Sequence, residues 1–271
     1  HQAADGSGGN GAAATVIVVR IDAAGNTRFR GGVAGFFAGT GGIVYVRVME
    51  RMDRDMEMTE AMTPWAASGM RELNRQYAAP VRATLTRLAA MPGEHARFLH
   101  MLSMLEHIGS RKIMLSQMGH DLPEDTLKHL AEEARHAHFF KRQAERLAGH
   151  KLPGYDAVNT TAFVSARMYF GRLDAWIARH VDGVAAYPWV SLIVELRACW
   201  LYALYQEVLV QAGATLSLKS LLAEEDLHLA EMYATCGADA DLLRRMSAFE
   251  TALFAQVWGR VEADSAGKSA A

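Results

Sequence analysis

Two short motifs in the chain combine a carboxylate and an imidazole at the spacing of metal ligands. The first consists of Glu133 and His136, and the second of Glu225 and His228, so the form Glu-x-x-His occurs twice. A spacing of three residues puts both side chains on one face of a helix, about one turn apart. Both can then reach one metal ion, or the Glu can bridge two ions while the His holds one.

A further glutamate lies on the helix expected before each motif, Glu106 before the first and Glu195 before the second. All four glutamates lie on apolar stripes at helical spacing, so they should face the core. Four buried carboxylates cannot all stay ionised unless cations lie among them, and two metal ions would supply that charge. The predicted ligands of this dinuclear site are Glu106, Glu133, His136, Glu195, Glu225 and His228.

Glu207 competes with Glu195 for the third glutamate position. Residues at one height in a helix hairpin are equidistant from the turn between the two helices. Glu207 meets this condition with Glu225 better than Glu195 does, so this test favours Glu207. Spacing favours Glu195, because Glu106 and Glu133 are 27 residues apart, Glu195 and Glu225 are 30 apart, and Glu207 and Glu225 only 18. Both hairpins must contribute ligands to one site at the same height in the bundle, so the spacing between their glutamates should be similar. We therefore favour Glu195 and keep Glu207 as the alternative.

Several residues near these candidate ligands have two possible roles. His129, one turn before Glu133, could orient a ligand, but a solvated histidine is the simpler interpretation. Glu132 and Glu224 each precede a ligand glutamate, and a rotation of ~100° per residue should turn them toward solvent or a neighbouring helix. Tyr202, two turns after Glu195, should pack in the core with its hydroxyl hydrogen-bonded.

Apolar periodicity predicts helices throughout the chain from Pro64 onward. The expected ranges are 64–90, 94–118, 123–149, 160–182, 188–213, 217–235 and 238–262. Helices 94–118 and 123–149 should form one hairpin, and helices 188–213 and 217–235 a second. Helix 160–182 lies between them and can serve as the long crossover of a four-helix bundle.

Residues 1–60 differ from the rest, because they are rich in Gly and Ala and then in Met. Residues 15–19 and 43–48 could be strands, but nothing around them builds a larger sheet. We therefore expect a disordered or non-core segment at 1–60, followed by one helical domain at 61–265.

Composition excludes several classes of protein. The 271 residues are 51% hydrophobic, enough for a sizeable core, and the formal net charge is −2, so no basic field favours nucleic acid. No apolar run reaches the ~20 residues that span a bilayer, and a secretory signal pattern is missing. With only Cys199 and Cys236, no disulfide framework is expected, and a reducing cytoplasm is the predicted location.

Over about residues 94–235 the chain resembles the ferritin-like di-iron carboxylate superfamily, whose six ligand positions match the six residues named above. The resemblance implies an all-α, ferritin-like four-helix bundle with additional flanking helices. It also implies two bound iron ions, with manganese or a mixed pair as alternatives, and a reaction with dioxygen. Glu106 and Glu195 would be terminal ligands, Glu133 and Glu225 would bridge, and His136 and His228 would each hold one ion.

The leading functional hypothesis is a non-haem di-iron oxidoreductase or oxygenase that acts on a small organic molecule. It would take electrons from a separate reductase, because the chain has no evident flavin or iron–sulfur motif, and it could work as a homodimer. The first alternative is a ferroxidase or metal-handling protein without an organic substrate. The second is a non-catalytic helical binding module, in which the buried Glu and His residues would pair with Arg or Lys.

Overall fold

The structure, a computed structural model, describes residues 15–21, 27–31, 46–49, 63–116, 123–181, 186–236 and 239–266. The chain divides into two compact units, His1–Glu60 and Ala61–Ala271. This division falls where the sequence predicts the change from the first segment to the helical domain.

The first unit contains three strands, β1 (Thr15–Ile21), β2 (Thr27–Gly31) and β3 (Val46–Met49). They form an antiparallel sheet in the order β2-β1-β3, with Ile17 opposite Gly31 on one side and opposite Arg47 on the other. Strands thus occur at both places where the sequence suggested them, inside a segment expected to be disordered. For the other residues of 1–60, the expectation of disorder lies outside the described residues.

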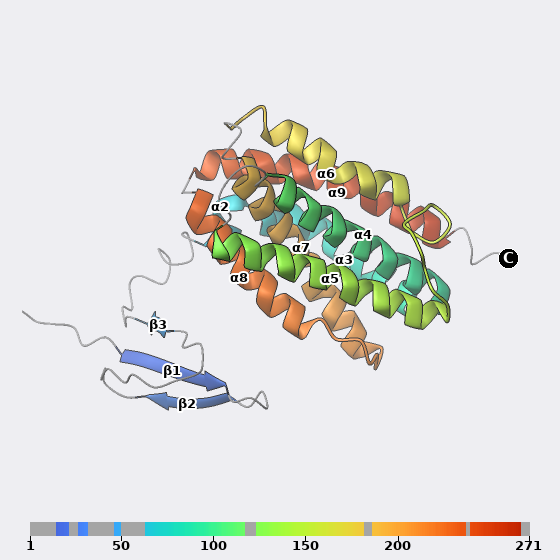
Figure 1. Cartoon of the computed structure of the whole chain (residues 1–271), viewed down its shortest axis with the longest axis horizontal. Coiled ribbons are helices and arrows are strands. Elements are labelled where there is room, and N and C mark those ends of the chain that lie inside the picture. Colours follow the sequence, from blue (N-terminus) through green and yellow to red (C-terminus); the bar gives the residue numbers. More distant parts are fainter. Residues whose placement is uncertain are drawn as a thin grey trace, which may run out of the picture. The chain divides into compact units, whose positions relative to one another are not determined.

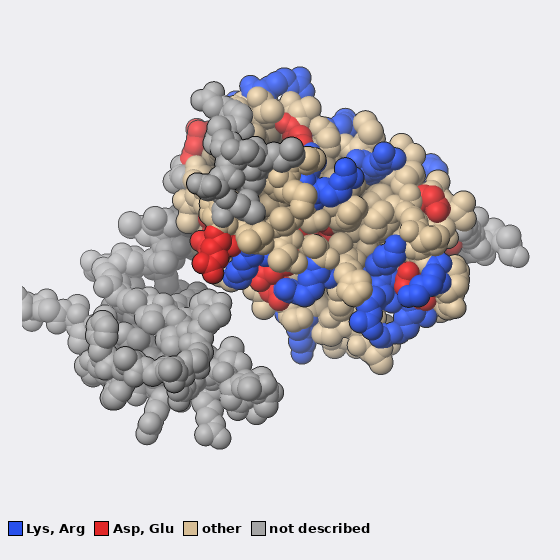
Figure 2. Space-filling model, in the orientation of Figure 1, with Lys and Arg blue, Asp and Glu red and all other residues tan. Residues whose placement is uncertain are grey.

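The described part of the second unit consists of helices and their connections, so the all-α prediction is confirmed for it. Its helices are α2 (Pro64–Ser68), α3 (Met70–Ala89), α4 (Pro92–Ser116), α5 (Glu124–Ala148), α6 (Phe163–Ile177), α7 (Ala186–Gln211), α8 (Lys219–Cys236) and α9 (Ala240–Ala266). In the described residues, no helix is both long enough and apolar enough to cross a membrane. Charged side chains of both signs lie on the face shown in Figure 2.

Two antiparallel hairpins position the candidate ligands. Helices α4 and α5 form the first, α7 and α8 form the second, and α5 also contacts α8 (Figure 1). The crossover helix α6 packs on α4, α7 and α9, while α3 packs on α7 and α9. The space between these helices is filled by fully buried apolar side chains such as Phe98, Phe140 and Leu192.

One predicted helix is two helices in the structure. The range 64–90 is broken at Gly69, whose φ of 67° lies in the left-handed region that favours glycine. Gly69 caps α2, with its amide donating to the Ala66 carbonyl at 3.4 Å, and α3 begins at the next residue. Apolar periodicity continues through Gly69, so the sequence pattern did not reveal the break.

The other helices lie close to their predicted ranges. Pro92 begins α4, as expected of a residue that lacks an amide hydrogen, and Gly149 ends α5 with a φ of 73°. Helix α6 is shorter at both ends than the predicted 160–182, and α9 runs four residues beyond the predicted 262. Most of the first predicted reversal, residues 119–123, lies outside the described residues.

Candidate metal centre

The six predicted ligand residues are buried together between the two hairpins, and each is at most 8% exposed. Helix α4 supplies Glu106, α5 supplies Glu133 and His136, α7 supplies Glu195, and α8 supplies Glu225 and His228. The competing residue, Glu207, lies at the surface and pairs with Arg82 at 2.6 Å. The structure thus places Glu195, and not Glu207, beside the other predicted ligand residues, in line with the spacing argument.

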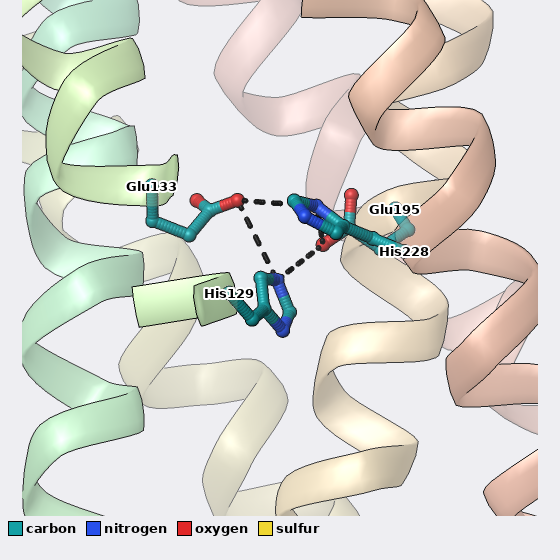
Figure 3. A group of neighbouring side chains, drawn as sticks. All are labelled: His129, Glu133, Glu195 and His228. Carbon is teal, nitrogen blue, oxygen red and sulfur yellow. Dashed lines mark hydrogen bonds and ion pairs between the residues drawn. The ribbon is translucent and has the colours of Figure 1, made fainter. Parts of the chain in front are cut away.

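The buried residues form two groups with the composition of metal sites. One group is His129, Glu133, Glu195 and His228, and the other is Glu106, Glu133, His136 and Glu225. Within each group, one candidate donor atom per residue lies within 4.8 Å of all the others. Glu133 belongs to both groups, as a bridging ligand would. Figure 3 shows the first group, in which side chains from α5, α7 and α8 point toward one another.

Glu133 Oε1 lies among the ring nitrogens of three histidines. It is 3.6 Å from His129 Nε2, 3.7 Å from His228 Nδ1 and 3.8 Å from His136 Nδ1. These separations are too long for hydrogen bonds. They suit donor atoms that share an ion about 2.0–2.2 Å from each of them.

Three buried polar atoms at this place make no hydrogen bond to any described residue: Glu133 Oε1, His136 Nδ1 and Glu225 Oε1. The last two lie 3.2 Å apart and form an ion pair when His136 is protonated, so Glu133 Oε1 is the one without a close partner. Buried polar atoms are nearly always paired, and leaving one unpaired costs roughly 1–3 kcal/mol. All three atoms are good ligands for iron, manganese or zinc. The residues present therefore fit a pair of metal ions.

The outer nitrogens of the two predicted histidines are held across the bundle. His136 Nε2 lies 2.7 Å from Glu224 Oε2, and His228 Nε2 lies 2.8 Å from Glu132 Oε2. A carboxylate can only accept, so each Nε2 donates a hydrogen and Nδ1 is turned toward the centre. Glu132 and Glu224 thus face a neighbouring helix, one of their two expected orientations. Arg135 links the motifs through an interhelical ion pair with Glu224 at 2.6 Å.

His129 is part of the cluster, so its interpretation as a solvated histidine was wrong. The side chain is 3% exposed, and its Nε2 lies 3.3 Å from Glu195 Oε1. Its other nitrogen, Nδ1, lies 3.1 Å from the Tyr187 hydroxyl. The sequence signal for this third histidine was its four-residue spacing from Glu133, which places the two side chains on one helix face.

Tyr202 lies at the other end of the cluster. As expected, it is buried in the core, and its hydroxyl donates a hydrogen bond to Glu106 Oε1. Burial, followed by the charges of Glu106 and Glu225, raises the pKa of Tyr202 well above its usual value. The hydroxyl therefore stays protonated and fixes the orientation of the Glu106 carboxylate.

Without metal, protons must balance the charge of this cluster. Burial, followed by the charges of neighbouring carboxylates, raises the pKa of Glu106 and of Glu195 well above 4.5. Burial alone would lower the pKa of His136, but contact with Glu225 and the surrounding carboxylates raise it to about 10. Burial would raise the pKa of Glu225, but its contacts with His136 and His228 lower it. Metal ions binding here must displace protons from these groups.

Two cavities adjoin the cluster, and both have Glu133 and Glu195 in their lining. The larger, about 580 Å³, has His129, Glu133 and Glu195 in its lining and runs between α4, α6 and α7. The smaller, about 80 Å³, is lined mainly by apolar and aromatic side chains, Tyr202 and Trp258 among them, together with Glu106 and Glu225. The cluster is therefore next to space that could admit small molecules.

Comparison of the chain with protein-family models, curated proteins and solved structures finds no match.

Proposed function

We propose that the helical unit is a ferritin-like bundle that binds two metal ions, iron or manganese, and acts as an oxidoreductase that activates dioxygen. One observation carries this proposal: two buried groups of side chains that can bind metal share Glu133, whose Oε1 makes no hydrogen bond and lies among three histidine nitrogens. The arrangement of the helices supports the ferritin-like assignment, because each hairpin contributes one Glu and one Glu-x-x-His pair.

In this proposal, Glu106, His136 and Glu225 hold one ion, and His129, Glu195 and His228 hold the other. Glu133 bridges them, and Glu225 can bridge as well, since its Oε2 lies 3.3 Å from His228 Nδ1. When bound, the metal pair supplies the electrons and open positions for a reaction with dioxygen, and an external reductase restores the electrons. The protein fixes the ligands through Glu132, Glu224, Tyr187 and Tyr202.

The larger cavity favours an oxygenase over the first alternative, a ferroxidase or metal-handling protein. A volume of about 580 Å³ lies within the ~300–1,000 Å³ typical of small-molecule sites. Metal ions alone would not require this space beside Glu195 and His129. The cavity thus supports an organic substrate, which is the leading hypothesis from the sequence.

The charge pattern weighs against the second alternative, a non-catalytic module. Such a module needs its buried carboxylates paired with Arg or Lys. In the described part of the chain, none of the four candidate ligand glutamates forms an ion pair with either residue type. The buried Arg197 pairs instead with Glu250, at 2.7 Å.

The direct test is elemental mass spectrometry of the purified protein beside the double variant Glu133→Ala/Glu225→Ala. The proposal expects close to two Fe or Mn per chain in the wild type and almost none in the variant. The reduced, metal-loaded wild type should then consume dioxygen, and the variant should not. Little metal in the wild type after anaerobic Fe(II) reconstitution would overturn the proposal. Oxidation of many Fe(II) ions per chain would favour the ferroxidase instead.

A further inference from the structure

The larger cavity connects the candidate metal centre to the surface of the helical unit. Its deepest lining residues are His129, Glu133 and Glu195, which are 3–6% exposed. Its outer lining includes Leu115, which is 58% exposed, and Ala178, which is also exposed. A molecule could therefore enter near the end of α4 and reach the side of the centre that carries Glu195.

The walls between the mouth and the deep end are mostly apolar. Ile113 comes from α4, Phe170 from α6, and Val190 and Val194 from α7. At Gly109 on α4, a Cβ atom would lie 3.3 Å from Glu133 Oε2 and 3.9 Å from the Phe170 ring. The glycine leaves that space free where the cavity meets the centre. These walls suit the hydrocarbon or aromatic body of a ligand.

The charged side chains of the outer lining balance each other. Lys112 on α4 forms an ion pair with Asp174 on α6, and their side chains are 29% and 36% exposed. Lys112 is the only Lys or Arg among the lining residues of this cavity, all of which are described. A singly charged ligand would be attracted by one partner and repelled by the other, and it would lose water on entering. A hydroxyl or amide could bond to both partners without breaking their pair.

We propose that this cavity binds an uncharged organic molecule with an apolar body and a hydrogen-bonding end group. The end group lies at Lys112 and Asp174, and the body lies along Phe170, Val190 and Val194 toward Glu195. This proposal rests on the proposed function, since it identifies the class of substrate that the metal centre would act on. It adds that the ion pair selects against charged molecules of the same shape.

Binding of three probes of equal length tests this proposal: octan-1-ol, octanoate and octylammonium. Isothermal titration calorimetry at pH 7 with the zinc-loaded protein measures binding without any oxygen chemistry. The wild type should bind octanol at least about tenfold more tightly than either ion. Asp174→Asn leaves Lys112 unpaired and should shift the preference to octanoate, whereas Lys112→Met should shift it to octylammonium.

A second pair of variants tests the location. Val190→Trp should fill the cavity and lower octanol affinity by at least about tenfold. Val210→Trp is the matched control, because Val210 lies on the same helix and is 64% exposed outside the cavity. The octanol affinity of Val210→Trp should equal that of the wild type.

The proposal is overturned if the wild type prefers a charged probe, if neither charge variant changes the order, or if Val190→Trp binds octanol normally. Failure here can be told apart from failure of the proposed function. Two metal ions and oxygen consumption without probe binding would refute the substrate class alone. Probe binding as expected in a protein that takes up no iron or manganese would refute the metal chemistry alone.

Discussion

Replacing Glu133 with alanine should abolish the stabilisation of the protein by metal ions. Its carboxylate belongs to both groups of candidate ligands, so its loss weakens both sites at once. The matched control is Glu207→Ala, which removes a glutamate that the sequence alone could not rule out as a ligand. Glu207 lies at the surface with Arg82, so its loss should leave metal binding unchanged.

The expected effect is large enough to measure by calorimetry. With free metal at 100 times Kd, each site stabilises the folded state by about 2.7 kcal/mol, so two independent sites contribute about 5 kcal/mol. In a domain the size of Ala61–Ala271, each kcal/mol raises Tm by roughly 2–4 °C. Added Mn(II) should therefore raise the Tm of the wild type and of Glu207→Ala by roughly 10–20 °C relative to the chelated protein.

The gain in Tm on adding metal should also depend on pH. In the metal-free protein, Glu106 and Glu195 have raised pKa values, so the folded state holds protons that the unfolded state releases above about 4.5. Protonated His136 stabilises the folded state, and because its pKa is raised from 6.5 to about 10, this contribution is fully present below pH 6.5 and is lost as the pH rises to about 10. Both effects lower metal-free stability as the pH rises. Bound metal replaces these protons, so the gain in Tm should grow from pH 6 to pH 9.

Three results would refute this reasoning. If the wild type gains no stability from Mn(II), Fe(II) or Zn(II), the cluster does not bind metal. If Glu133→Ala keeps the full gain, the two sites do not share this ligand. A gain that shrinks with rising pH would mean that protons do not compete with metal at the cluster.

Three further predictions concern single residues. His129→Ala should reduce the metal content from about two ions per chain to about one by elemental mass spectrometry, because His129 belongs to only one group. Glu224→Gln should weaken metal binding by about 10–100-fold in a competition titration, since it removes the carboxylate that orients His136. Glu250→Ala should lower the free energy of unfolding by about 3–5 kcal/mol in urea, because it leaves the buried Arg197 without its ion-pair partner.

The amino-acid sequence was enough to predict the helices and most of the candidate ligand residues. Helical periodicity is local, so the positions of α4, α5, α7 and α8 could be predicted from their apolar stripes and from their Pro and Gly boundaries. The three-residue spacing within each motif is also local, and it places Glu133 beside His136 wherever the helix lies. The repetition of the motif then indicated that two helices share one site.

Which of Glu195 and Glu207 lies in the cluster depends on how α7 packs in the bundle. Both lie on α7, and because they are twelve residues apart, at ~100° per residue their side chains point in directions about 120° apart. The rotation of α7 turns Glu195 toward the centre and leaves Glu207 at the surface beside Arg82. The rotation of a helix against its neighbours is set by the fit of many side chains along all of them, so it is known only when all of them are placed.

The contacts that hold the candidate ligand side chains are also tertiary. Glu132 contacts His228, and Glu224 contacts His136, so each motif orients the histidine of the other. Tyr187 does the same for His129 from a third helix. These partners are 58 to 96 residues apart along the chain. Sequence patterns show which face of a helix is apolar, but they do not show which residues that face contacts. The sequence therefore indicated a metal centre. Its third histidine and the adjoining cavity could not be predicted, because both depend on how the helices pack.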